Sequence, residues 1–284
     1  MITNPRTQSE EIICAPVSNW QRLFECVRER RVPVRLKQLG PELLGRLSGQ
    51  SVVFCRRGRK KFLKFQVNAQ SMSDLLLHEV FTSRVYFPTI DQATTFKVGR
   101  NDLVIDVGSN VGLFAVCAAN QTRRQVYCFE PSRANFAELE RHQRLNKLDN
   151  MVLVNQGISD RRETLRLYLH DNNCGAHSVF LDKGDGLSFD EDQYEEIECI
   201  SLKEVFDNYE IEKCDFLKID CEGAEGKILH ALPPEYFKRI SHIALEYHAN
   251  VDVLQLAELL DRNGFLVVIK GYPVKWGLLF AVRQ

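Results

Sequence analysis

The strongest constraint on the fold is a regular alternation of strand-like and helix-like segments that begins near residue 101. Short apolar runs predict strands, and longer amphipathic runs between them predict helices. The predicted strands cover residues 103–107, 125–130, 151–156, 215–220, 242–247, 265–270 and 278–282, and the predicted helices cover 111–120, 132–148, 222–232 and 251–263. Strands separated by helices need crossover connections, so we expect an α/β domain with a mostly parallel sheet.

The alternation changes in two places. Only GYPVKWG, residues 271–277, separates the last two predicted strands, which is too short for a parallel crossover and predicts an antiparallel hairpin. Residues 157–200 interrupt the pattern with short strand-like pieces and an acidic, glycine-bearing loop. An insertion of this length is more often functional than idle, and we expect its acidic part, residues 182–198, to act as a lid.

Charge is distributed unevenly along the chain, although the overall net charge of −1 indicates no partner. Residues 20–64 hold thirteen Lys/Arg and three Glu, whereas residues 182–198 hold eight Asp/Glu and one Lys. The basic stretch predicts either a solvated face or contact with an anionic partner, such as RNA, an anionic membrane, an acidic carrier protein or a charged glycan. We therefore expect a basic N-terminal extension or substrate cap, residues 1–70, before a main domain, residues 71–284.

The extension carries few structural signals. Residues 1–19 are expected to be a loose terminus, residues 20–31 a short helix, and residues 51–67 a hairpin that turns at Gly58. Ser71 and Asp74 stand at capping-box spacing before a helical run. The nine cysteines show no C-x-x-C spacing, and the N-terminus has no secretory signal pattern, so we expect reduced thiols in a cytoplasmic protein. No apolar run approaches the length of a membrane span.

A glycine turn follows the first predicted strand in IDVGSNVGLF, residues 105–114. Ligands of parallel sheets bind beyond the carboxyl ends of the strands, where this turn lies. Gly108 tolerates a positive φ, and Gly112 allows close packing of helix and strand. The turn is not G-x-G-x-x-G, because Asn110 replaces the glycine that admits a pyrophosphate. Asp106 would repel a diphosphate and attract an ammonium group.

Glu130 ends the second predicted strand, where an acid accepts hydrogen bonds from the hydroxyls of a ribose. The turn and this acid together predict an adenosine ligand with a positive, phosphate-free tail, which favours S-adenosylmethionine over NAD. Two alternatives stay open at this point. The glycine turn could serve packing alone, with Asp106 a solvated strand end, or the protein could be a nicotinamide oxidoreductase, which Asn110 disfavours.

Three strings resemble the FkbM-type methyltransferase family: DLVIDVGSNVGLFAV, VYCFEPSRANF and, most specifically, DFLKIDCEGAEGKIL. The resemblance covers roughly residues 75–270. It implies a Rossmann-like class I S-adenosylmethionine-dependent methyltransferase that mainly methylates hydroxyl groups of sugars and natural products. It also implies a seven-stranded sheet of order 3-2-1-4-5-7-6, with strand 7 antiparallel and helices on both faces.

The resemblance also implies roles for individual residues. The methionine end of the cofactor would be held by Asp106, Gly108, Ser109, Asn110 and Gly112. The ribose would be held by Glu130, the adenine would lie beside Gly157 and Ile158, and Asp220 would lie near the transferred methyl group.

Methyl transfer to an alcohol needs alignment and gains from a general base. Asp220, Glu222, Glu246 and His248 follow two strands that are neighbours in the expected order, so they should converge at one edge of the sheet. We expect His248 to be the base, assisted by Asp220 and Glu246, because its unperturbed pKa is roughly 6.5; the alternative is an ordinary loop histidine. Glu225 is expected only to be a carboxylate in the first turn of a helix, where the helix dipole stabilises it. This cluster could also bind Mg²⁺ or Ca²⁺, but nothing in the spacing demands a metal, so none is expected.

Other acceptors are less favoured. Amino-methylating enzymes of nucleic acids carry an Asn/Asp-Pro-Pro-aromatic string where this chain has IDCEG, and Cys221 is expected to pack rather than to act as a nucleophile. The predicted function is therefore O-methylation of a small molecule, natural product or sugar, free or carrier-bound. RNA methylation through the basic segment and non-catalytic binding of an adenosine ligand are the alternatives.

Overall fold

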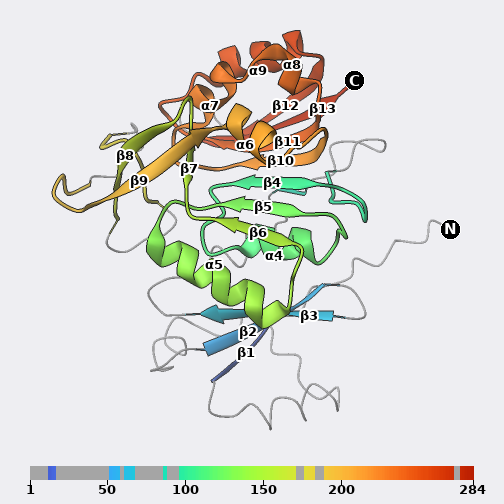
Figure 1. Cartoon of the computed structure of the whole chain (residues 1–284), viewed down its shortest axis with the longest axis vertical. Coiled ribbons are helices and arrows are strands. Elements are labelled where there is room, and N and C mark those ends of the chain that lie inside the picture. Colours follow the sequence, from blue (N-terminus) through green and yellow to red (C-terminus); the bar gives the residue numbers. More distant parts are fainter. Residues whose placement is uncertain are drawn as a thin grey trace.

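The core of the molecule is a seven-stranded sheet (Figure 1). A computed structural model describes residues 12–16, 51–57, 61–67, 86–87, 96–170, 176–182, 189–271 and 276–284. The strands of the main sheet are β4 (Val104–Val107), β5 (Val126–Phe129), β6 (Met151–Val154), β10 (Cys214–Ile219), β11 (Ile240–Tyr247), β12 (Phe265–Gly271) and β13 (Gly277–Arg283). All seven fall within or beside the segments predicted as strands.

The strand order confirms the expected topology. Read from one edge, the order is β6-β5-β4-β10-β11-β13-β12, which is 3-2-1-4-5-7-6 in chain order. The first five strands pair in parallel, and β13 is antiparallel to both β11 and β12. The predicted C-terminal hairpin is therefore confirmed, and the fold is that of a Rossmann-like class I methyltransferase.

Helices cover both faces of the sheet, because successive strand side chains point to opposite sides. Phe216 joins one hydrophobic core and the adjacent Leu217 joins the other. The first core is covered by α4 (Leu113–Ala119) and α5 (Arg133–Asn146). The second is covered by α6 (Leu202–Asn208), α7 (Glu225–Ala231), α8 (Pro234–Phe237) and α9 (Val253–Arg262). In the part of the chain that the structure describes, no helix has the length and apolar composition to cross a membrane.

The interruption at residues 157–200 contains a second, three-stranded sheet. Its strands are β7 (Gly157–Ser159), β8 (Glu163–Tyr168) and β9 (Tyr194–Ser201), in the order β7-β9-β8. Figure 1 shows it beside the edge where β4, β5 and β6 end. The end of the acidic segment is thus a strand: Ile197 and Cys199 are buried, whereas Glu196 and Glu198 are exposed. Residues 183–188 lie outside the described residues, so the lid stays a prediction.

The N-terminal region contributes a third sheet of three antiparallel strands, β1 (Ile12–Pro16), β2 (Ser51–Arg57) and β3 (Lys61–Val67). The hairpin predicted for residues 51–67 is confirmed. The prediction of a loose terminus was wrong for residues 12–16, which form β1. Leu63 and Phe65 are buried in the core that α4 covers, and the Phe65 ring lies 5.3 Å from that of His142 on α5. The predicted helices at residues 20–31 and after Ser71 lie outside the described residues, and a role as substrate cap stays a prediction.

Candidate active site

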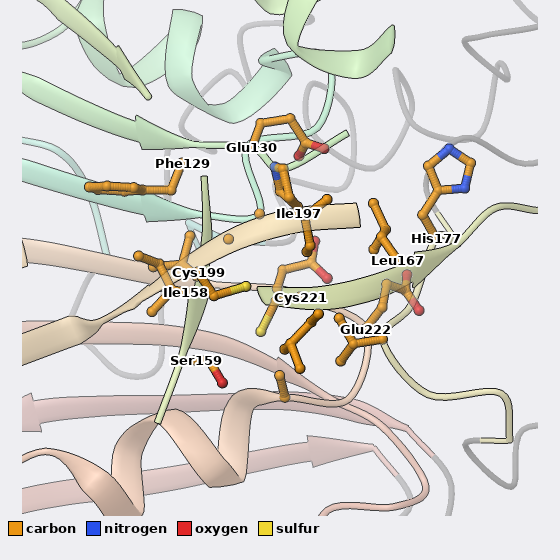
Figure 2. A pocket seen from close by; sticks show the side chains of 18 of the residues that line it. Phe129, Glu130, Ile158, Ser159, Leu167, His177, Ile197, Cys199, Cys221 and Glu222 are labelled. Atoms are coloured by element: carbon orange, nitrogen blue, oxygen red, sulfur yellow. The ribbon is translucent and has the colours of Figure 1, made fainter. Parts of the chain in front are cut away.

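A cavity with about 800 Å³ of empty space, part of it open to solvent, lies beyond the carboxyl ends of β4, β5 and β10. The second sheet closes its other side with Leu165, Leu167, Ile197 and Cys199. Figure 2 shows Glu130 on one side of this cavity and Cys221 with Glu222 on another. The predicted ligand position at the strand ends is therefore a cavity, lined by the ends of three parallel strands and by the second sheet.

The glycine turn has the backbone conformation that its residues predict. Gly108 has a φ of 73°, and a Cβ added there would lie 1.8 Å from the Asp220 carbonyl oxygen. Asn110 itself takes a left-handed φ of 49°, which asparagine tolerates better than most residues, and its Oδ1 accepts a hydrogen bond from Val111 N at 2.8 Å. Both Gly108 and Asn110 line the cavity. Asn110 thus stands where a G-x-G-x-x-G turn has its second glycine, and it takes a left-handed conformation that glycine adopts readily.

Glu130 lies where a ribose-binding acid is expected. Its side chain lines the cavity, although only 5% of the residue is exposed. Its carboxylate accepts hydrogen bonds from Asn110 N at 2.7 Å and from Ser132 N at 3.0 Å. Burial raises the pKa of Glu130 to about 7, and these two donors only partly offset that rise. The carboxylate is therefore fixed in place, faces the cavity, and titrates near neutral pH.

The expected adenine subsite is apolar. Gly157 and Ile158 of β7 line the cavity, together with the apolar side chains of β8 and β9. A Cβ at Gly157 would lie 2.7 Å from Cys199 Sγ, so only glycine allows β7 and β9 to approach this closely. The sequence indicated the two β7 residues but not the opposing strands.

Asp106, Ser109 and Gly112 do not line the cavity, contrary to their expected contact with the cofactor. Asp106 is fully buried because it shares a face of β4 with Val104, which is covered by α4. Ser109 Oγ donates to the Asp106 carbonyl oxygen at 3.1 Å. A Cβ at Gly112, whose φ is 88°, would lie 2.4 Å from Leu139 Cδ1 on α5. These three residues pack beneath the turn, and their contact with the cofactor stays a prediction.

The partner of Asp106 is Lys218, which sequence reasoning missed. Lys218 pairs with Asp106 in the register of β10 and β4, and its Nζ lies 3.3 Å from Asp106 Oδ1. The same Nζ lies 3.4 Å from Asp220 Oδ2 and donates to the Gly108 carbonyl oxygen at 2.6 Å. Burial alone would lower the pKa of Lys218, but the two carboxylates outweigh it and raise the pKa above its usual value. One buried ammonium therefore links the glycine turn to Asp220.

Asp220 lines the cavity, as expected, and is held from two sides. Besides Lys218, the Tyr86 hydroxyl donates to Asp220 Oδ2 at 2.8 Å and lies 3.3 Å from Glu246 Oε2. Burial would raise the pKa of Asp220, but the positive charges of Lys218 and His248 and the hydrogen bonds from Tyr86 and Lys218 together outweigh it and lower the pKa. Asp220 is thus an ionised carboxylate at the cavity wall. Glu246 lies behind it, joined through Tyr86.

The surroundings of His248 do not match those of a general base. Only 6% of the residue is exposed; Nε2 lies 3.2 Å from Glu222 Oε2, and Nδ1 lies 3.1 Å from Glu225 Oε1. Burial would lower the pKa of His248, but the two glutamates outweigh it and raise the pKa to about 11. With both ring nitrogens facing carboxylates, no nitrogen is left to accept a proton from an alcohol, so the expected base role has no support in this geometry.

Glu225 is not only a carboxylate stabilised by the dipole of α7; it also holds the turn that precedes this helix. It is fully buried, and its Oε1 accepts hydrogen bonds from Cys221 N and Gly223 N, each at 3.1 Å. Glu222 and Gly223 in this turn both take left-handed φ values, 57° and 110°. Burial raises the pKa of the Cys221 thiol well above its usual value, which agrees with packing and not with a reactive thiolate. The turn between β10 and α7 is therefore anchored from inside.

The chain is similar in sequence to one family model and to several known proteins. The family model described as the methyltransferase FkbM domain matches residues 106–267. The 31-O-demethyl-FK506 methyltransferase FkbM of Streptomyces tacrolimicus is 26% identical over 230 residues, which cover 71% of this chain and 85% of that protein. The methyltransferase sdnD of Sordaria araneosa is 23% identical over 257 residues, covering 78% and 94%. The AMB antimetabolite synthetase AmbE of Pseudomonas aeruginosa is 26% identical over 236 residues, covering 70% of this chain, and the match spans 11% of its length.

Proposed function

Because the chain belongs to the FkbM methyltransferase family, we propose that it methylates a hydroxyl oxygen of a small molecule or sugar. S-adenosylmethionine is the cofactor. The observation that carries the choice of an oxygen acceptor is the ionised Asp220 carboxylate, which faces the cavity and is held by Lys218 and Tyr86. The similar FkbM protein is named for a 31-O-methylation, which supports the same acceptor atom here.

The residues of the cavity fit this cofactor. Glu130 offers a fixed carboxylate for the two ribose hydroxyls, and Ile158 with the β8 and β9 side chains offers an apolar slot for the adenine. We propose that the backbone at Gly108 and Asn110 contacts the methionine end, because both residues line the cavity at the end of β4. Bound S-adenosylmethionine supplies a methyl carbon on a sulfonium, which is ready for displacement.

The chain's own residues then align the acceptor and remove its proton. Alignment of the acceptor oxygen with the methyl carbon supplies on the order of 7–11 kcal/mol. The oxygen forms the new O–C bond, the S–C bond breaks with its electron pair going to sulfur, and the hydroxyl proton passes to Asp220. A base in this position contributes roughly 10²–10⁴-fold. Lys218 and Tyr86 fix Asp220 at the cavity wall, and Glu246 shares the Tyr86 hydroxyl.

Two assays test this proposal. The first is calorimetric titration with S-adenosylhomocysteine, with NAD as the control ligand; we expect only the former to bind. The second is transfer of a labelled methyl group to a panel of sugars, polyols and phenols, with an RNA pool as the competing acceptor. Asp220→Asn should retain ligand binding and lose turnover, whereas Glu258→Gln on the exposed face of α9 should change neither. Labelling of RNA alone, or NAD binding alone, would contradict the proposal.

A further inference from the structure

The turn between β10 and α7 brings the carboxylates of Asp220 and Glu222 close to His248, which directly follows β11. One ligand atom each from Asp220, Glu222 and His248 lie within 4.8 Å of one another. We propose that these three residues bind one divalent cation of the Mg²⁺ or Mn²⁺ class, which holds the acceptor oxygen. The proposal deepens the proposed function and rests on it for the role of the ion, although binding of the ion itself is independent of turnover.

The histidine is arranged as metal-binding histidines are. In metal sites the ring nitrogen that does not bind the ion usually donates its N–H to a carboxylate. Here Nδ1 lies 3.1 Å from Glu225 Oε1, while Nε2 points to Glu222 Oε2 at 3.2 Å. Glu225 is fully buried and fixed by the backbone amides of Cys221 and Gly223. Glu225 therefore orients the imidazole, and a cation beside Glu222 would take the place of the proton on Nε2.

The charge around the cluster also favours a cation. Asp220 and Glu246 meet at the Tyr86 hydroxyl, Glu222 and Glu225 meet at His248, and Asp106 lies on the other side of Lys218. Lys218 lies beside two of these five carboxylates, Asp106 and Asp220. A divalent cation would add positive charge at the point where Asp220 and Glu222 converge.

The donor set and its position decide the kind of ion and its use. Two carboxylate oxygens suit Mg²⁺ and Mn²⁺, and the single imidazole nitrogen is compatible with Mn²⁺ in particular. Three protein ligands leave coordination positions for water and for a substrate oxygen. Asp220 and Glu222 line the cavity, so those positions face the acceptor side. An ion there would lower the pKa of a bound hydroxyl and orient it, so that its proton passes more readily to the Asp220 oxygen that does not bind the ion.

The test is a titration of the full, chelator-treated chain with MnCl₂, in which free Mn²⁺ is counted by electron paramagnetic resonance. We expect one ion per chain, with competition by Mg²⁺. Glu222→Gln and His248→Gln should each abolish saturable binding, and Glu225→Gln should weaken it by roughly ten- to hundredfold. Glu258→Gln, on the exposed face of α9, is the matched control and should bind as the natural chain does.

Two further measurements keep the outcome decisive. Each variant is titrated with S-adenosylhomocysteine, and a variant that no longer binds it is set aside as misfolded. In that case the pulsed electron paramagnetic resonance spectrum of Mn²⁺ bound to the natural chain decides whether the site exists. Coupling of Mn²⁺ to one imidazole nitrogen supports the proposal, and absence of this coupling overturns the proposal. Lack of saturable binding at millimolar Mn²⁺, or binding unchanged in both ligand variants, also overturns it. Methyl transfer that persists in EDTA would remove the ion's role while leaving the proposed function intact, whereas failure to bind S-adenosylhomocysteine would affect only the function.

Discussion

The affinity of the protein for S-adenosylhomocysteine should rise with pH between 6 and 8 because of Glu130. Burial raises the pKa of this carboxyl to about 7. Ribose hydroxyls donate hydrogen bonds, so the bound state needs the ionised carboxylate. Below the folded pKa the carboxyl is neutral and must release a proton on binding, which weakens the affinity. Above it, the carboxylate is already ionised and the affinity becomes constant.

The magnitude follows from the size of the shift. At pH 6, one unit below the pKa, about one-tenth of the Glu130 carboxyls are ionised, so binding should be about tenfold weaker than at pH 8, or about 1.4 kcal/mol. The same shift acts on stability without ligand. Because the folded pKa lies above the unfolded value of 4.5, the contribution of Glu130 is fully present below pH 4.5 and is lost as the pH rises through 7.

Calorimetry in two buffers of different ionisation heat measures both the affinity and the protons released. We expect about one proton released at pH 6 and almost none at pH 8. His177 lines the same cavity, and burial lowers its pKa, so it is the other group to control for. Glu130→Gln should bind weakly with no pH dependence, and Glu140→Gln on the exposed side of α5 should keep the natural profile. A flat profile in the natural chain, or an equal slope in Glu130→Gln, would refute the reasoning.

Three further variants test the support of the site. Lys218→Met leaves Asp106 and Asp220 without their cation and should cost about 3–5 kcal/mol of unfolding free energy in urea; a loss under about 1 kcal/mol would show that the pair is not strongly coupled. Gly108→Ala should abolish S-adenosylhomocysteine binding, because its Cβ would lie 1.8 Å from the Asp220 carbonyl oxygen at a φ of 73°; retained affinity would argue against a close backbone contact. Tyr86→Phe removes the hydrogen bond to Asp220 and should slow methyl transfer by about ten- to hundredfold with unchanged ligand affinity; an unchanged rate would remove Tyr86 from the machinery.

Most of the main domain was predictable because its signals are local. Apolar runs fixed the seven strands, and the short link at residues 271–277 required the antiparallel hairpin that the structure contains. The helix α6 was missed even though Ser201 and Glu204 form a capping box at its start. It lies between the predicted insertion, residues 157–200, and the predicted strand, residues 215–220, where no element was expected. The second sheet was predicted only as short strand-like pieces, because its strands pair across the acidic segment and that pairing has no local signal.

Individual site residues were predictable when their role depends on position at a strand end. Gly108, Glu130 and Asp220 follow or end three parallel strands, and all three line one cavity. Asp106 does not line this cavity, because the alternation within β4 directs its side chain under α4, where Lys218 lies beside it. That pairing depends on the register of β10 and β4, which joins residues 112 positions apart and has no local signal.

His248 shows how the surroundings of a residue can replace the role that its type suggests. From sequence, an imidazole with an ordinary pKa beside carboxylates is a natural general base. In the structure the same carboxylates approach both of its nitrogens, and Glu225 is itself fixed by two backbone amides. Between these carboxylates both nitrogens hold a proton at neutral pH, which removes the base role. A cation that displaces the Nε2 proton would meet a ring that Glu225 already orients. The loss of the base role and the proposed cation site therefore follow from one arrangement, and Glu225→Gln, which loosens the imidazole without touching the ion, should impair cation binding more than cofactor binding.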